Sequence, residues 1–349
     1  MSPMLGIMAS AISGNLKAAQ MVAIAGGGNP TMVAAYPWSA GFGTKFASPT
    51  WSNAFGSGQS VAVNFAGTSI AVSTDYTPFI YAFPWSSAGF GTKYSNPATL
   101  PPDTGNNTNF NADGTNLTVS FISSPYTYTY PFSAGFGTRY ANPATLPTGT
   151  AYGVNFNPAG TALSVGHDTS PYVSNYAWSS GYGAKYANPA TLPTGGGRGV
   201  TFNPAGTAFA LGWNGAGGAG VGFYAYPWSA GFGTKYANPA SLPNGDGHGA
   251  AFNPAGTAIA QSDGGADYIN AWAFSAGFGT KYSNPASLPA GNSKGVSWNR
   301  LGTDIAVSDN GVTPYIKVYP WSAGFGTKYS NPATAPQGTG SIGGDVVFV

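Results

Sequence analysis

The stretch that decides the fold is Ala230-Gly231-Phe232-Gly233-Thr234-Lys235-Tyr236, which occurs seven times along the chain, unchanged or as a close variant. The first glycine of each copy is Gly41, Gly89, Gly135, Gly181, Gly231, Gly277 or Gly324. The copies lie 46 to 50 residues apart. A period of this length, filled with short alternating segments, is typical of a propeller blade of four β-strands. The sequence therefore predicts an all-β, seven-bladed β-propeller of four-stranded antiparallel blades.

The unit of residues 148–193 shows how the strands are expected to fall. We predict strands at 153–156, 162–165, 172–178 and 184–187. The first two are joined by Asn157-Pro158-Ala159-Gly160-Thr161, where proline suits a turn and glycine supplies the left-handed residue that follows it. Two prolines in residues 188–193 exclude a central strand, so this segment should connect one blade to the next.

The turn glycine recurs in six complete copies, at Gly67, Gly114, Gly160, Gly206, Gly256 and Gly302, and the seventh is missing. Residues 345–349 match a first strand, whereas residues 20–25 begin as a second strand and are followed by expected strands at 31–38 and 43–47. We expect the two chain ends to share the closing blade, because closure removes exposed sheet edges. The alternative is that both ends are ragged repeats that never meet.

Over residues 20–349, the strand order, the hairpin and an aromatic residue at the end of the third strand resemble the WD40-type propeller family. The chain lacks the family's Trp-Asp dipeptide, so its hydrogen-bond network is not carried over. The Gly-rich, charge-poor repeats, such as residues 229–243, also resemble those of predicted structural proteins of tailed bacteriophages. Residues 5–14 are similar to short N-terminal segments of phage virion proteins.

Composition excludes several classes of function. Charged residues make up 6% of the 349 residues, which is too few for the basic face of a nucleic-acid-binding protein. The absence of cysteine excludes disulfides and thiolate metal sites. The sequence contains no run of 18 apolar residues, so no membrane insertion is predicted. The chain has no Glu for a pair of catalytic carboxylates, no Gly-x-Ser-x-Gly elbow, and only two histidines. These absences predict no enzymatic activity, no cofactor and no metal site.

Two features repeat in every unit. An aromatic residue ends the third strand and is expected to pack between sheets: Trp38, Trp85, Phe132, Trp178, Trp228, Phe274 and Trp321. One cation per unit forms an expected ring of seven: Lys45, Lys93, Arg139, Lys185, Lys235, Lys281 and Lys328. We favour protection of the outer strand edge for this ring, and the alternative is a collar that binds polyanions.

Function should be sought where the copies disagree, in the loops between second and third strands and in the tails before each first strand. In a WD40-like blade both sets project on one face. The candidate ligand face comprises Asp75, His167, Asp168, Arg198, Trp213, Asp246, His248, Asp263, Asp267, Lys294 and Asp309. The alternative is that tolerant loops drift without a function.

Residues 1–19 stand apart from the repeats and carry no charge before Lys17. Leu5, Ile7, Met8 and Ile12 suggest an arm that docks into a groove on other virion proteins, and a signal peptide is the alternative. The phage resemblance then implies a non-catalytic, structural or adhesive virion component, either a capsid decoration or a tail or fibre protein. It would display the propeller of residues 20–349 in many copies toward a host-surface glycan or protein. A secreted bacterial carbohydrate-binding propeller is the alternative.

Overall fold

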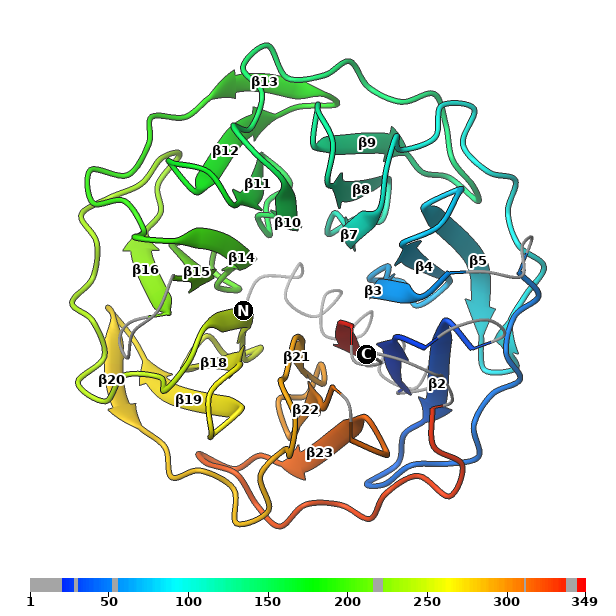
Figure 1. The fold of residues 1–349 in the computed structure, drawn as a ribbon, viewed down its shortest axis with the longest axis vertical. Helices are drawn as coiled ribbons and strands as arrows, with labels where there is room; N and C mark the ends of the chain where they lie inside the picture. The colour runs from blue at the N-terminus through cyan, green and yellow to red at the C-terminus, as the bar shows by residue number, and fades with distance from the viewer. Residues whose placement is uncertain (1–20, 28–30, 52–55, 216–221, 311, 337–343) are drawn as a thin grey trace, which may run out of the picture.

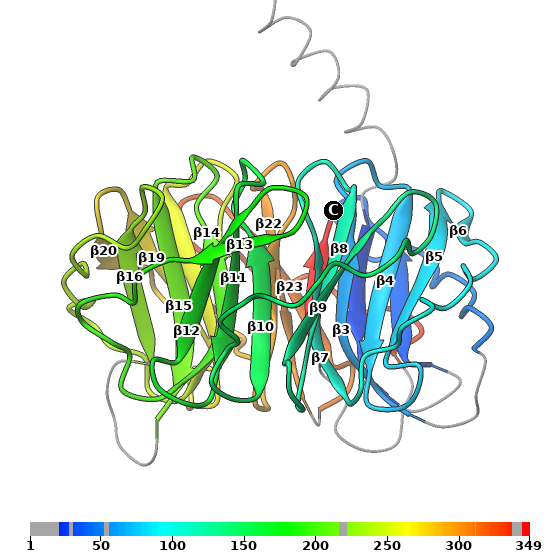
Figure 2. The same cartoon turned by 90° about the horizontal axis from the view of Figure 1, so that it is seen from above.

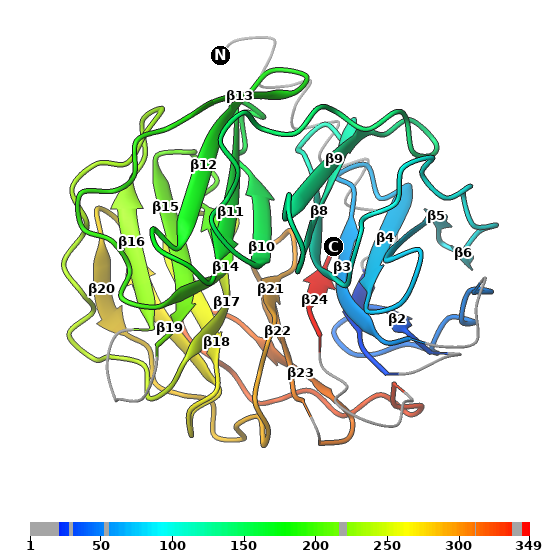
Figure 3. The same cartoon turned by 45° about the horizontal axis from the view of Figure 1, so that its top comes forward.

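The computed structural model describes residues 21–27, 31–51, 56–215, 222–310, 312–336 and 344–349. Within these ranges every regular element is a β-strand, and the strands form seven antiparallel sheets of three or four strands. The sheets are arranged around a central axis, and one strand of each lies nearest that axis (Figure 1). The side and oblique views show the sheets forming a disc (Figures 2 and 3). The predicted all-β, propeller-like fold is confirmed.

Four sheets contain three strands each, namely β2 (Val33–Pro37), β1 (Met21–Ala25) and β24 (Val346–Phe348); β7 (Gly105–Phe110), β8 (Asn116–Phe121) and β9 (Thr127–Pro131); β14 (Gly196–Phe202), β15 (Ala208–Asn214) and β16 (Phe223–Pro227); and β21 (Val296–Trp298), β22 (Asp304–Ser308) and β23 (Ile316–Pro320). Three sheets contain four, namely β3 (Gly58–Val63), β4 (Ser69–Thr74), β5 (Ile80–Ser86) and β6 (Gly89–Phe90); β10 (Ala151–Phe156), β11 (Ala162–His167), β12 (Val173–Trp178) and β13 (Tyr182–Lys185); and β17 (Gly247–Phe252), β18 (Ala258–Asp263), β19 (Ile269–Phe274) and β20 (Phe278–Lys281). Each sheet is named below after its innermost strand: β24, β3, β7, β10, β14, β17 or β21.

The expectation of four strands in every blade is therefore correct for three sheets only. In the other four, the outer segment makes a single bridge to the end of the third strand, as between Trp228 and Phe232. In each of these four sheets a proline comes directly before the bridged aromatic residue, whereas Ala177 and Ala273 precede it where β13 and β20 are four residues long. Proline has no N–H to donate to a fourth strand, which explains the difference.

The predicted hairpin forms between β10 and β11. The side-chain Oδ1 of Asn157 accepts hydrogen bonds from the backbone N–H groups of Thr161 (2.7 Å) and Ala162 (2.8 Å). Gly160 has a φ of 66°, a left-handed conformation that glycine adopts without strain. The turn is thus fixed by residues that recur in six of the seven repeats, and it joins the first two strands in each of them.

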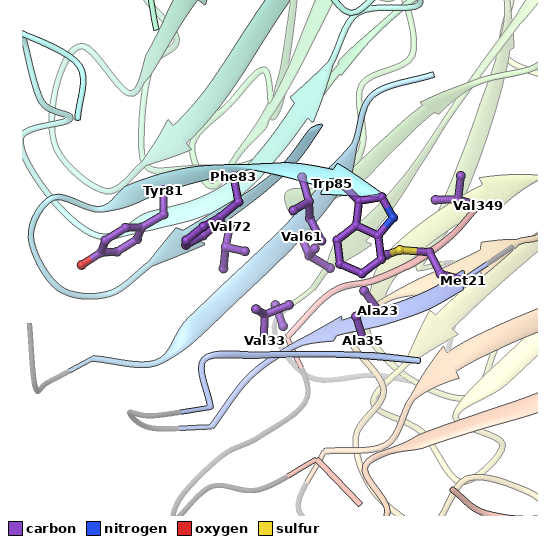
Figure 4. Packing of buried hydrophobic residues seen from close by; sticks show 12 residues of the cluster. Met21, Ala23, Val33, Ala35, Val61, Val72, Tyr81, Phe83, Trp85 and Val349 are labelled. Carbon is purple, nitrogen blue, oxygen red and sulfur yellow. The ribbon is translucent and has the colours of Figure 1, made fainter. Parts of the chain in front are cut away.

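The two ends of the described chain lie in one sheet. β24 pairs with β1 in antiparallel fashion, with Val347 opposite Ala23. Met21 and Val349 exchange backbone hydrogen bonds of 3.2 and 2.9 Å. The side chains of both residues pack beside Trp85 of the neighbouring β3 sheet (Figure 4). Apolar burial between sheets thus supports the junction of the first and last strands.

The aromatic residue that ends each third strand is buried, with exposed fractions of 3 to 7%. Trp178, for example, meets Tyr140 of the preceding unit edge to face, with ring centroids 5.2 Å apart. The predicted packing role is confirmed. The predicted arm, with Leu5, Ile7, Met8 and Ile12, lies outside the described residues. Among the described residues, no helix is long and apolar enough to cross a membrane.

Candidate functional site

The innermost strands surround a cavity of about 540 Å³ along the central axis. Five of these strands carry a register shift near their start, where an extra residue interrupts the pairing with the second strand. Such a bulge turns a side chain out of the regular alternation. All seven sheets contribute to the lining, and polar or charged lining residues near the start of the inner strands include Gln59, Asn106, Tyr152, Arg198, His248, Lys294 and Asp345.

Glycines next to these residues let the neighbouring sheets approach closely. A Cβ atom at Gly153 would lie 2.0 Å from the carbonyl oxygen of Arg198. A Cβ at Gly199 would lie 2.5 Å from the carbonyl oxygen of His248. Only glycine fits between these backbones, so the side chains from adjacent sheets are brought together on one wall.

Arg198, His248 and Lys294 form a cationic sector on the β14, β17 and β21 sheets. The guanidinium carbon of Arg198 lies 3.6 Å from the centre of the Tyr152 ring, which holds it by a cation–π contact. The Nε of Arg198 is buried and has no hydrogen-bond partner among the described residues. Burial lowers the pKa of Lys294, and the positive charge of Arg198 lowers it further. Two cations on one cavity wall that are near enough for one to lower the pKa of the other favour the binding of an anion.

His248 is fixed by its backbone neighbour. Its Nδ1 lies 3.0 Å from the carbonyl oxygen of Ser293, and a carbonyl can only accept, so Nδ1 carries the proton. No described residue hydrogen-bonds Nε2, which therefore keeps a free lone pair. Burial lowers the pKa of His248, and the charges of Arg198 and Lys294 lower it further against the opposing Ser293 hydrogen bond. The ring is thus neutral at neutral pH, with Nε2 able to accept a proton.

Asp345 provides the acidic sector. Its Oδ2 accepts hydrogen bonds from the hydroxyl of Ser60 (3.0 Å) and the amide of Asn107 (3.2 Å). Its backbone N–H donates to the carbonyl of Gln59 (3.0 Å), and its own carbonyl accepts from Ala25 (3.0 Å). The residue is half-buried in the cavity lining, and burial raises the pKa of its carboxyl group to about 6. The same residue thus lines the cavity and joins the last strand to its own sheet and to the β3 and β7 sheets.

Three residues of the predicted ligand face are fully buried and tie the second strand to the third. His167 Nε2 lies 3.0 Å from the hydroxyl of Ser174, and burial lowers the pKa of His167 to about 4. Asp263 accepts a hydrogen bond from the amide of Asn270, and Asp309 forms an ion pair with Lys317. These three positions are equivalent in their units, and each residue has a different partner on the third strand: Ser174 for His167, Asn270 for Asp263 and Lys317 for Asp309.

Five further residues of that face make their contacts away from the cavity lining. Asp75 accepts from the backbone of Ser57, Asp168 from the hydroxyl of Thr169, and Asp246 from the backbone of Gly215. Asp267 forms an ion pair of 3.1 Å with Lys281, and Trp213 packs on Tyr224 with ring centroids 5.9 Å apart. The structure therefore brings together three of the predicted residues at the cavity: Arg198, His248 and Lys294.

The remaining lining residues were missed by the sequence analysis. Gln59, Asn106, Tyr152 and Asp345 line the same end of the cavity but were not proposed. For Gln59, Asn106 and Tyr152 the signal was present in the repeats: a different residue occupies this position in successive units, and in four units the next residue is glycine, as in Tyr152-Gly153. Asp345 lies one position later in its unit, where Gly295 stands in the preceding one. In the described part of the chain, no group of three or more His, Asp or Glu side chains could hold a metal ion.

The predicted ring of cations lies on the outer segments. Lys93, Arg139, Lys185, Lys235 and Lys328 each donate to the side chain of the asparagine three residues later. Lys281 pairs with Asp267, and Lys45 is followed three residues on by Ser48 instead of asparagine. The asparagine contacts hold five of these side chains along their own strand.

No family model matches this chain, and no curated protein matches it. Solved structures of similar shape are found. A putative 6-phosphogluconolactonase from Bacteroides uniformis has a TM-score of 0.69 at 14% identity, with 95% of this chain and 100% of that one covered. A periplasmic gluconolactonase from Pseudomonas aeruginosa gives 0.67 at 14% identity, covering 95 and 99%. A protein from Lactobacillus plantarum gives 0.71 at 12% identity, also covering 95 and 99%.

These neighbours correct two expectations from the sequence. The predicted non-catalytic virion component is contradicted, because the neighbours are named as lactonases and the phage resemblance finds no support among them. The prediction that the chain is not an enzyme is contradicted on the same ground, and the lectin alternative is also unsupported. The expectation of no activity rested on the absence of a pair of carboxylates, whereas this cavity gathers Arg198, His248, Lys294 and Asp345 from separate repeats. At this identity the likeness shows the fold alone.

Proposed function

We propose that the chain is a closed seven-bladed propeller whose central cavity hydrolyses a lactone bearing an anionic group. The observation that carries the proposal is the cationic sector: Arg198, Lys294 and a neutral His248 line one wall of the cavity. The count of seven sheets and the pairing of β24 with β1 support the closed ring. The names of the neighbouring structures, 6-phosphogluconolactonase and gluconolactonase, supply the reaction class.

The chemistry needs a base and a site for negative charge. His248 Nε2 takes a proton from water as the water oxygen bonds to the lactone carbonyl carbon. The carbonyl oxygen becomes an oxyanion, which the ammonium of Lys294 stabilises, while Arg198 holds the anionic group of the substrate. The ring C–O bond then breaks, and the leaving oxygen takes the proton back from His248. One lactone and one water thus give one hydroxy acid.

Proton release from glucono-δ-lactone and from 6-phosphogluconolactone tests the proposal, with buffer alone as the measure of spontaneous hydrolysis. We expect His248→Gln to lower kcat by about 100-fold, because it removes the base. Arg198→Met should raise KM more for the phosphorylated lactone than for the plain one. Asp168→Asn is the matched control, since its carboxylate is exposed and bonds only within its loop. The absence of any acceleration over buffer by the unmodified protein would overturn the proposal.

A further inference from the structure

We propose that Asp345 is a specificity residue that accepts hydrogen bonds from the hydroxyl groups of a polyhydroxylated ligand. This inference rests on the proposed function and names the substrate class of the same cavity: a sugar-derived lactone or acid with free hydroxyls. It assigns to the two sectors of the wall different tasks. The cationic sector holds the anionic group, and Asp345 distinguishes a polyol from an unsubstituted ring.

Asp345 is the one carboxylate among the described residues that line the cavity. Its Oδ2 is occupied by Ser60 and Asn107, whereas its Oδ1 accepts only the N–H of Val346 at 2.9 Å among the described residues. A carboxylate oxygen accepts up to two hydrogen bonds, so Oδ1 has capacity left. The Ser60 and Asn107 contacts hold the carboxylate in place.

Gly295 of the adjacent β21 sheet packs against this side of Asp345. A Cβ atom at Gly295 would lie 2.5 Å from Oδ1 of Asp345, so any other residue at position 295 would collide with the carboxylate. The preceding residue in the same sheet is Lys294, which belongs to the cationic sector. The free acceptor and the cations thus lie on neighbouring sheets of one wall.

A carboxylate could bind either an ammonium group or a hydroxyl group, and the charges of the cavity favour the hydroxyl group. An ammonium group would have to enter a cavity that already holds Arg198 and Lys294, and like charges repel it. A hydroxyl group is neutral and escapes that repulsion. The other titratable residues that line the cavity are Tyr152 and His248. A ligand that offers hydroxyl groups to Asp345 and an anionic group to Arg198 and Lys294 therefore fits the wall best.

The test compares glucono-δ-lactone with δ-valerolactone, which has the same ring and no hydroxyl groups. We expect Asp345→Asn to lower kcat/KM for gluconolactone by about 10- to 100-fold, the loss of a hydrogen bond to a charged group, and to leave δ-valerolactone unchanged. Asp168→Asn is the matched control, because it makes the same substitution at an exposed carboxylate outside the cavity lining. An equal loss for both lactones in Asp345→Asn would overturn the inference.

The unmodified protein provides a second readout that needs no variant. Below pH 6 the protonation of Asp345 should reduce the preference for gluconolactone over δ-valerolactone, whereas protonation of His248 slows both reactions alike.

Binding of gluconate, measured by calorimetry, separates the two proposals. If no lactone is hydrolysed but Asp345→Asn weakens gluconate binding about 10-fold, the inference stands and the proposed reaction falls. If lactones are hydrolysed and the preference is unchanged in Asp345→Asn and at low pH, the inference falls alone. If gluconate neither binds nor is formed, both fall.

Discussion

The outer rim and the cavity wall of this molecule are built from the same repeat, but the rim is nearly identical from unit to unit whereas the wall differs. Along the rim, the segment from Gly231 to Pro239 is nearly identical in every unit, and its lysine and asparagine contact each other. At the cavity wall, successive units place different side chains at one equivalent position, as Tyr152, Arg198 and His248 show. The shared residues build the blade, whereas the divergent position gives the ring its chemistry. Changes at shared positions should therefore appear in stability, and changes at the wall in ligand binding.

The largest effect is expected from Trp178→Ala. Trp178 is 5% exposed and meets the rings of Tyr140, Phe156 and Tyr182 at 5.1 to 5.2 Å. Removal of a buried tryptophan leaves a cavity and should lower the free energy of unfolding by about 4 kcal/mol. Urea denaturation measures this loss. Gluconate affinity of the fraction that stays folded should not change, and a large loss of affinity there would break the division between rim and wall.

The hairpin asparagine should have a smaller effect. In Asn157→Ala the N–H groups of Thr161 and Ala162 lose their acceptor, and Ala162 is buried. An unsatisfied buried donor costs about 1 to 3 kcal/mol, so we expect a loss near 2 kcal/mol in the same denaturation experiment. Asn157→Asp retains an acceptor and serves as the control. A loss as large in Asp as in Ala would show that the hydrogen bonds are not the cause.

His167 sharpens the comparison, because it varies between units and yet lies outside the cavity wall. Its folded pKa of about 4 lies below the 6.5 of an unfolded histidine, so the unfolded chain binds more protons between these values. Its contribution is complete above pH 6.5 and is lost as the pH falls toward 4. Relative to His167→Asn, the unmodified protein should lose about 1.5 kcal/mol of stability between pH 6.5 and 5. Thermal unfolding at each pH measures the difference, and parallel curves would contradict it.

The sequence was sufficient for the features that recur. The spacing of Gly231 and its equivalents predicted the repeat, and the turn around Asn157 predicted the hairpin of β10 and β11. It was insufficient for the cavity, because Asp345 and Gln59 are far apart along the chain and meet only when the first and last strands pair. The burial of His167 and Asp309 also could not be predicted from the local sequence, because their partners lie on the next strand. Long-range pairing, more than propensity, decided which polar residues became the site.

The smallest effect is expected at the rim cation Lys235. Its ammonium donates to the carbonyl of Tyr236 (3.0 Å) and the side chain of Asn238 (2.5 Å), and it lies 4.4 Å from the ring centre of Tyr224. Both acceptors are neutral and the site is partly solvated, so Lys235→Gln should change the free energy of unfolding by no more than about 0.5 kcal/mol. Gluconate affinity should not change either.

If these cations protect the strand edge, replacing Lys93, Arg139, Lys185 and Lys235 together by Gln should raise light scattering at high protein concentration while unfolding stays cooperative. Unchanged scattering together with weaker binding of a polyanion such as heparin would instead support the collar.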